Sequence, residues 1–251
     1  AEVPLIVDNT MATPWLCRPF EWGADLVVHS TTKFLSGQGN AMGGIVIDSG
    51  RFPWFGNAKY PSLSDPCPDY NGLTFAETFG DMAFTLYSHA VSLRDLGCTQ
   101  SPMNAWITLN GVETLPLRME RHVENAQKVA GFLQQHPSVE WVSYAGLSSS
   151  PYYQLAQKYL QGKAGSVFTF GIRGGYESGL RLLEKVELFS HVSNIGDSRS
   201  LILHPASTTH RQLSDEQRLT AGAGPEVIRL SVGIESAEDL IADLEQALEG
   251  L

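Results

Sequence analysis

A single lysine stands among hydroxyl and glycine residues in the stretch "VVHSTTKFLSGQGNAMGG", residues 27–44. A phosphate-binding loop would place glycines before the lysine, in the pattern G-x-x-x-x-G-K-[ST], whereas here the glycines follow it. A Schiff-base lysine instead needs a desolvated amine flanked by groups that hold an aldehyde cofactor. A lone lysine in such a turn is more often a solvated charge, so the assignment of Lys33 depends on its neighbours.

Three nearby residues have the chemistry that a pyridoxal phosphate site needs besides its lysine. Ser30 and Thr32 are two residues apart, so on extended backbone their hydroxyls would face the same way and could donate to the phosphate. Asp8 ends the apolar run "PLIVD" and could keep the pyridine nitrogen protonated, which strengthens the ring as an electron sink. Singly, such residues are turn formers or helix caps. In combination with Lys33 they predict a pyridoxal phosphate site.

The elements that must position these residues are short apolar strands. The runs "PLIVD", "ADLVVHS" and "GGIVIDS" predict three strands, and "MATPWLCRPFEWG" between the first two is long enough for a short helical crossover. This rhythm is typical of a mixed, mostly parallel sheet in an α/β fold, whose ligands bind at the carboxyl ends of the strands. Asp8 and residues 30–33 lie at two such ends. The first strand, residues 3–7, is expected to be buried and central.

The remainder divides into three parts. Residues 51–80 are rich in proline, glycine and aromatic residues and predict a long loop within the first domain, 1–100. This loop either packs on its own aromatics or lines a site or subunit contact. Residues 101–138 predict a linking helical region that Pro116 interrupts. Residues 139–251 alternate short strands and helices, which predicts a smaller α+β domain.

Arg229 and two histidines are the other candidates for chemistry. Arg229 lies inside the apolar strand "VIRLSV", where an unpaired guanidinium is costly, and its planar fork suits a carboxylate. A structural ion pair is the alternative. His204 and His210, in "HPASTTH", have neither zinc-motif nor helical-ligand spacing, so we interpret both as structural or as hydrogen-bonding loop residues. No metal site is predicted.

Composition excludes several classes of protein. The 251 residues are 43% hydrophobic and 18% charged, which is typical of a folded domain, and the net charge of −10 argues against a nucleic-acid surface. No run approaches the ~20 apolar residues of a membrane span, and no signal peptide is evident. The three widely spaced cysteines fit reduced thiols. We therefore expect a cytoplasmic protein with neither nucleic-acid nor membrane partners.

The stretch "VDNTMATPWLCRPFEWGADLVVHSTTKFLSGQGNAMGGIV" resembles the lysine segment of the Cys/Met-metabolism family of pyridoxal-phosphate enzymes. The resemblance continues through "LRDLGCTQSPMNAWITLNGVETLPLRMERHVENA", "FSHVSNIGDSRSLILHPASTTHRQL" and "PEVIRLSVGIESAEDLIADLEQAL", and so covers nearly the whole chain. It implies the C-terminal part of a fold-type I pyridoxal-phosphate transferase.

The resemblance also implies roles for individual residues. It makes Lys33 the Schiff-base lysine and Asp8 the acid at the pyridine nitrogen. Ser30 and Thr32 match the phosphate-binding hydroxyls. Arg229 matches the arginine that binds the substrate α-carboxylate, and Ser193 matches a position that assists at that carboxylate.

Within the family, the aromatic segment 51–80 and "LRMERHVENA" resemble the O-acetylhomoserine sulfhydrylases. This implies a γ-replacement in which O-acetyl-L-homoserine and sulfide give L-homocysteine and acetate, a step of methionine biosynthesis. Methionine γ-lyase or O-succinylhomoserine sulfhydrylase chemistry, or a non-catalytic fragment, are the alternatives.

The family resemblance further implies that parts of the site lie upstream of "AEVPLIVDNT". These parts are an aromatic that stacks on the cofactor, a glycine-led phosphate turn, and a Tyr and an Arg from a partner subunit. We therefore expect an additional N-terminal segment and a homo-oligomer, a tetramer of two-fold dimers.

Overall fold

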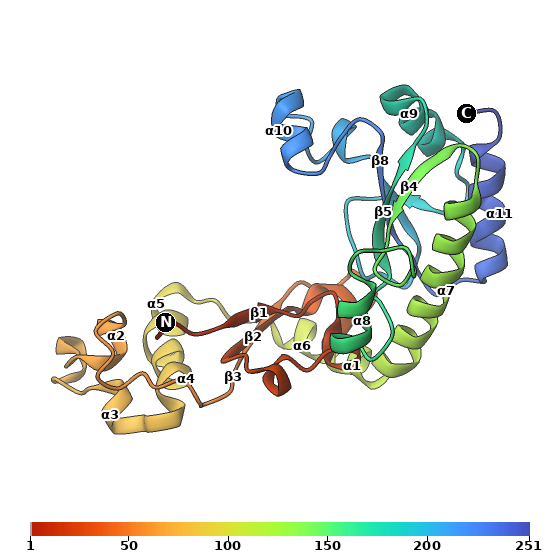
Figure 1. The fold of residues 1–251 in the computed structure, drawn as a ribbon. Helices are drawn as coiled ribbons and strands as arrows, with labels where there is room; N and C mark the ends of the chain where they lie inside the picture. Colours follow the sequence, from red (N-terminus) through yellow and green to blue (C-terminus); the bar gives the residue numbers. More distant parts are fainter. Residues whose placement is uncertain (1) are drawn as a thin grey trace.

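The computed structural model describes residues 2–251 and has two lobes, each built on its own β-sheet (Figure 1). The first lobe contains a three-stranded sheet and the second a five-stranded sheet. The long helix α7 (Leu115–Gln135) leads from the first lobe into the second. The α/β class expected from the sequence is confirmed.

The first sheet has the order β1 (Ile6–Asp8), β2 (Leu26–Ser30) and β3 (Gly44–Asp48). β1 pairs with β2 in parallel through the crossover α1 (Thr13–Leu16) and η1 (Pro19–Trp22), and β2 pairs with β3 antiparallel. The strand predicted over residues 3–7 begins three residues late. Its side chains are also exposed rather than buried, Ile6 to 55%, because no other segment of residues 2–251 covers them.

Residues 51–80, expected as a long loop, contain the short helices α2 (Pro61–Ser64) and α3 (Phe75–Phe79) and the single turn η3 (Pro68–Tyr70). Prolines begin α2 and η3, where a missing N–H costs nothing. Further turns follow in η4 (Gly80–Met82), α4 (Ala83–Tyr87), η5 (Ser88–Leu93) and α5 (Arg94–Leu96). The aromatic residues of this region pack on one another in a cluster that includes Phe52, Trp54, Tyr60, Phe75, Phe84 and Tyr87. This packing agrees with the first of the two readings of the loop.

Two helices link the lobes. α6 (Pro102–Glu113) begins with the Ser101 hydroxyl accepting from the Asn104 N–H and with a proline in the first turn. Pro116 lies in the first turn of α7, so it separates the two helices instead of kinking one.

The second sheet has the strand order β4-β5-β8-β7-β6. Its strands are β4 (Val139–Ser143), β5 (Val167–Ile172), β6 (Ser190–His191), β7 (Leu201–Leu203) and β8 (Val227–Ser231). All neighbours are antiparallel except β6 and β7. The accompanying helices are α8 (Tyr153–Tyr159), α9 (Gly175–Lys185), α10 (Asp215–Thr220) and α11 (Ala237–Leu248), with η6 (Pro205–Ser207) after β7.

The core of the second lobe lies between this sheet and helices α7, α9 and α11. α7 and α11 run side by side (Figure 1), and Leu240, Leu244 and Leu248, spaced four residues apart on α11, are fully buried on one face of that helix. Within residues 2–251, no helix is long and apolar enough to cross a membrane.

Candidate active site

Lys33 lies in a single π-type turn, η2 (Thr31–Leu35), that directly follows β2. Its backbone (φ −88°, ψ −131°) is not helical, so the turn is kinked at the lysine itself. Such turns are rare in proteins, and many of those that occur lie at functional sites. The side chain is half-buried, and its ammonium donates a hydrogen bond to Oδ1 of Asn194.

The surroundings of Lys33 lower the pKa of its ammonium below the ordinary value, first through burial and then through the positive charge of Arg229. A lysine acts as a nucleophile or base only when its amine is neutral. The site therefore favours the reactive form of Lys33.

Asp8 ends β1, beside the end of β2 that carries Lys33. The parallel register pairs Asp8 with Val28, two residues before Ser30. The Thr10 N–H donates to the Asp8 carboxylate (3.0 Å), and the Thr10 hydroxyl accepts from the Ser30 N–H (2.8 Å). The hydrogen bond from the Thr10 hydroxyl and then that from its N–H lower the pKa of Asp8, so this exposed acid stays ionised. Thr10 was not predicted as a site residue.

The structure corrects the expected geometry of Ser30 and Thr32. Ser30 is the last residue of β2, but Thr32 lies inside η2, so the two residues do not share one extended segment. The Thr32 hydroxyl donates to the Gly43 carbonyl (3.3 Å) and accepts from the Gly43 N–H (3.1 Å). The Ser30 hydroxyl makes no hydrogen bond within residues 2–251 and is the more available donor. A phosphate role for both residues stays a prediction.

Arg229 projects from β8 of the second lobe and is half-buried, which lowers the pKa of its guanidinium. Its Nη2 donates to the main-chain carbonyl of Asn194 (3.2 Å). No acidic side chain within the described part of the chain forms an ion pair with Arg229, which speaks against the structural alternative.

Asn194 thus contacts Lys33 with its side chain and Arg229 with its backbone. Ser193, the predicted residue, is exposed, and its role stays a prediction. The loop that carries both residues is held by two hydrogen bonds, from the Ser198 N–H to the Gly37 carbonyl (2.8 Å) and from the Gly196 N–H to the Ser231 hydroxyl (3.0 Å). No sequence pattern indicates Asn194, because its contacts depend on how the lobes meet.

Within residues 2–251, the histidines and the acidic residues are not grouped as the ligands of a metal ion would be. His204 is buried and meets the Ser207 hydroxyl (3.0 Å) and the Pro225 carbonyl (2.9 Å), which agrees with the structural interpretation. Residues 2–251 contain no group of three or more His, Cys, Asp or Glu side chains that could hold a metal ion.

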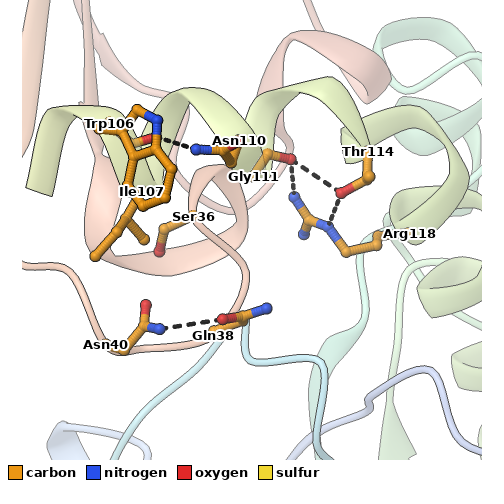
Figure 2. Close-up of a pocket in the computed structure, with 9 residues that line it drawn as sticks. All are labelled: Ser36, Gln38, Asn40, Trp106, Ile107, Asn110, Gly111, Thr114 and Arg118. Atoms are coloured by element: carbon orange, nitrogen blue, oxygen red, sulfur yellow. Dashed lines mark hydrogen bonds between the residues drawn. The ribbon is translucent and has the colours of Figure 1, made fainter.

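A pocket of about 330 Å³ lies beside the Lys33 turn, between it and α6 (Figure 2). Ser36, Gln38 and Asn40 line one side, and Trp106, Ile107, Asn110, Gly111, Thr114 and Arg118 line the other. Lys33, Asp8 and Arg229 do not line it. This pocket therefore lies on the α6 side of the Lys33 turn and is not the candidate site. The candidate site is the junction of the lobes around Asn194, where Lys33 and Arg229 meet.

The residues present suit pyridoxal phosphate. Lys33, with its lowered pKa, suits the aldehyde of the cofactor. The ionised Asp8 at the neighbouring strand end suits the ring nitrogen, and the hydroxyl of Ser30, which is free within the described residues, suits the phosphate. Arg229 adds a group for a carboxylate.

Comparison with known proteins agrees with this fit. The model of the family described as Cys/Met metabolism PLP-dependent enzyme matches residues 1–249. The chain belongs to this family of pyridoxal-phosphate-dependent enzymes.

Several relatives are similar to nearly the whole chain. An O-acetyl-L-homoserine sulfhydrylase of Leptospira meyeri is 51% identical over 99% of this chain and 58% of its own length. O-acetyl-L-homoserine sulfhydrylase 1 of Thermus thermophilus is 50% identical over 98% of this chain and 58% of its own length. The homocysteine synthase of Schizosaccharomyces pombe is 45% identical over 99% of this chain and 58% of its own length.

A solved structure has the same fold. The crystal structure of a Campylobacter jejuni protein described as an O-acetylhomoserine (thiol)-lyase, with N'-pyridoxyl-lysine-5'-monophosphate, superposes with a TM-score of 0.94 at 43% identity. The superposition covers 99% of this chain and 59% of that one, so the fold-type I class is confirmed. The chain spans about 58% of the length of the curated relatives it matches.

Proposed function

We propose that the protein containing this chain converts O-acetyl-L-homoserine and sulfide into L-homocysteine and acetate, with pyridoxal phosphate as its cofactor. The similar sulfhydrylases and homocysteine synthase support this reaction. The proposal concerns the whole protein, because the chain spans only part of the length of these relatives. We further propose that polypeptide outside these 251 residues completes the cofactor site.

One observation carries the proposal. Asn194 brings together a lysine of lowered pKa from the first lobe and, from the second, an arginine that forms no ion pair with the rest of residues 2–251. An α-amino acid bound here would place its carboxylate at Arg229 and its amino end towards Lys33. The opposed arrangement of an amine-reactive group and a carboxylate-binding group suits an amino-acid substrate.

Four residues would hold the cofactor. Lys33 would bind its aldehyde carbon, Asp8 its ring nitrogen, and Ser30 and Thr32 its phosphate; Thr32 would first have to release Gly43. Pyridoxal phosphate, when bound, supplies an electron sink for negative charge at the substrate Cα.

The residues of the chain perform the remaining steps. Arg229 anchors the α-carboxylate, with Ser193 in the neighbouring loop as the assisting residue carried over from the family. The anchored carboxylate fixes the direction of the Cα–H bond. Lys33, its pKa lowered by burial, takes the Cα proton as a neutral amine and moves a proton at Cβ. Acetate then departs from Cγ, and hydrosulfide adds at the same carbon. Asp8, whose pKa is lowered and which is therefore ionised, would keep a proton on the ring nitrogen of the bound cofactor.

The test is a chemical label on Lys33. The protein is incubated with pyridoxal phosphate, reduced with borohydride and digested, and the modified peptide is identified by mass spectrometry. The cofactor should be fixed on Lys33, with violet absorption before reduction. Lys33→Ala should lose both and reduce turnover by ~10³-fold or more. Lys128→Ala, which removes an exposed lysine of α7, is the matched control.

The products separate the alternatives. Homocysteine formed only with sulfide supports the replacement reaction, whereas a 2-oxo acid and ammonia formed without sulfide indicate γ-elimination. A preference for the succinyl ester would indicate an O-succinylhomoserine sulfhydrylase. A wild-type protein that fixes no cofactor would be a non-catalytic relative, and the proposal would fail.

We also propose a cytoplasmic homotetramer of two-fold dimers. Exposed apolar residues on and after α6 support an assembly, with Trp106 and Leu109 more than 60% exposed. Sedimentation of the active protein tests this proposal, and a monomeric active species would contradict it.

A further inference from the structure

Arg118 of α7 directs its guanidinium at the turn that carries Lys33. Its Nη1 donates to the Phe34 carbonyl (2.8 Å), and its Nη2 donates to the carbonyls of Leu35 (3.3 Å) and Gly111 (2.6 Å). Its Nε donates to the Thr114 hydroxyl (3.1 Å; Figure 2). A single side chain from another helix thus donates hydrogen bonds to the main-chain carbonyls of the two residues that immediately follow Lys33.

This cation is held only by neutral groups. Arg118 forms no ion pair with an acidic residue anywhere in residues 2–251, and burial lowers the pKa of its guanidinium. A half-buried charge without a counter-ion is costly unless several hydrogen bonds satisfy it. Carbonyls at the end of a helical turn lack partners and carry partial negative charge, so Arg118 and the Lys33 turn satisfy each other.

The turn is also enclosed by close backbone contacts. A Cβ on Gly111 would lie 2.5 Å from the carbonyl oxygens of Leu35 and Ser36, and a Cβ on Gly196 would lie 2.7 Å from the Phe34 nitrogen. Side chains at these glycines would therefore displace the turn. The kinked turn at Lys33 is thus packed between α6 and the Asn194 loop. Arg118 holds it through hydrogen bonds to the Phe34 and Leu35 carbonyls.

We propose that Arg118 is a positioning residue for the reaction: it fixes the Lys33 turn through the Phe34 and Leu35 carbonyls and so holds the lysine amine at the point where cofactor and substrate meet. The inference rests on the proposed function. The charge that acts on Lys33 is that of Arg229, so Arg118 acts through geometry. Its loss should impair the steps that Lys33 performs and spare those that Arg229 performs.

The test compares Arg118→Ala and Arg118→Lys with a control, Arg121→Ala. The control removes an exposed arginine three residues further along the same helix. Two assays are run at a temperature where circular dichroism shows each variant folded. The first measures the rate at which Lys33 captures added pyridoxal phosphate, followed by borohydride trapping and mass spectrometry. The second measures kcat and KM for the amino-acid substrate.

For Arg118→Ala we expect capture at least ~10-fold slower and kcat about 10²-fold lower, with KM within twofold, because a small displacement of a reacting group is costly. Arg118→Lys should recover part of both losses, since an ammonium reaches one carbonyl but not three. Capture and kcat within twofold of Arg121→Ala would overturn the proposal and leave Arg118 a structural residue.

If Arg118→Ala does not fold, the proposal is tested with Thr114→Val instead. It removes the acceptor of the Nε hydrogen bond, together with the hydroxyl's own hydrogen bond to the Gly111 carbonyl (3.2 Å), and leaves the three carbonyl contacts of Arg118 in place. It should reduce kcat about threefold to tenfold with KM unchanged, and an unchanged kcat would overturn the proposal. Failure of the proposed function is distinct, because the wild-type protein itself would then capture no cofactor on Lys33.

Discussion

The two sheets of the molecule differ in how their apolar residues are covered. In the first sheet Val46 and Ile6 are each 55% exposed within residues 2–251, whereas Ile228 and Leu230 of the second sheet are fully buried under helices. Yet Asp8 ends a strand of the first sheet and Lys33 lies in the turn that follows β2, whereas only Arg229 comes from the second sheet. The proposed reactive groups thus lie at the less enclosed sheet, and the second sheet supplies packing and the arginine proposed to bind the substrate carboxylate.

This difference predicts that substitutions in the two sheets will have different readouts. Changes at the strand ends of the first sheet should affect the rate with little effect on stability. Changes inside the second sheet should affect the free energy of unfolding.

Asp8→Asn should have the largest effect on rate among these variants. A neutral side chain cannot hold the proton on the ring nitrogen, so kcat should fall on the order of 10²- to 10³-fold, while the cofactor still binds. Because Asp8 is exposed, the thermal unfolding midpoint should stay near the wild-type value. Steady-state kinetics and cofactor absorbance measure the effect, and Asp69→Asn is an exposed control in the same lobe. Near-normal turnover would remove Asp8 from the site.

Ile228→Ala should have the largest effect on stability. Removing buried methyl groups and leaving a cavity costs about 3–4 kcal/mol of unfolding free energy. Val46→Ala, on the exposed face of β3, should cost below ~0.5 kcal/mol in the 251-residue chain. Urea titration of both variants tests the contrast, and equal costs would contradict it.

His122 should make stability depend on pH at the junction of the lobes. Its Nδ1 lies 2.7 Å from the Val232 carbonyl and so carries the proton, while its buried Nε2 has no hydrogen-bond partner within residues 2–251. Burial lowers the pKa of His122 to about 4.

The sign follows from proton binding. Between pH 6.5 and 4 the unfolded histidine binds a proton that the folded one does not, so stability falls as the pH falls through this window, by about 3 kcal/mol in total. His122→Asn keeps a donor and removes the titration, so its stability should vary less with pH. His191→Asn, at an exposed histidine, is the control. Parallel pH profiles for wild type and His122→Asn would contradict the prediction.

Arg229→Lys should have the smallest effect of the four. An ammonium replaces a two-pronged guanidinium, so KM for the amino acid should rise about tenfold while cofactor binding stays unchanged. Arg181→Lys on α9 is the exposed control. If KM does not change, Arg229 is structural.

The sequence predicted the second lobe well because its signals are local. The cap at Ser236 and the spacing of Leu240, Leu244 and Leu248 determine α11 without reference to the rest of the chain. Lys33, Asp8 and Arg229 were recognised as candidates from residue type, position in a strand and the family resemblance, and the structure directs Lys33 and Arg229 at the same residue.

The errors arose where geometry depends on more than local pattern. Alternation predicted that Ser30 and Thr32 share a face, but the chain leaves the extended conformation at Thr31. Neither Asn194 nor Arg118 was predicted, because a loop asparagine and a helical arginine have no distinctive spacing and contact the Lys33 region only after the lobes pack.

The hydrogen bond between Lys33 and Asn194 joins residues 161 positions apart in the chain. The entropy lost in closing so long a loop is compensated only after both lobes have folded and docked. The complete site is therefore one of the last features to form, and in refolding the capture of cofactor would lag behind the return of helical signal. Cofactor bound at Lys33, as proposed, would therefore report that folding has finished.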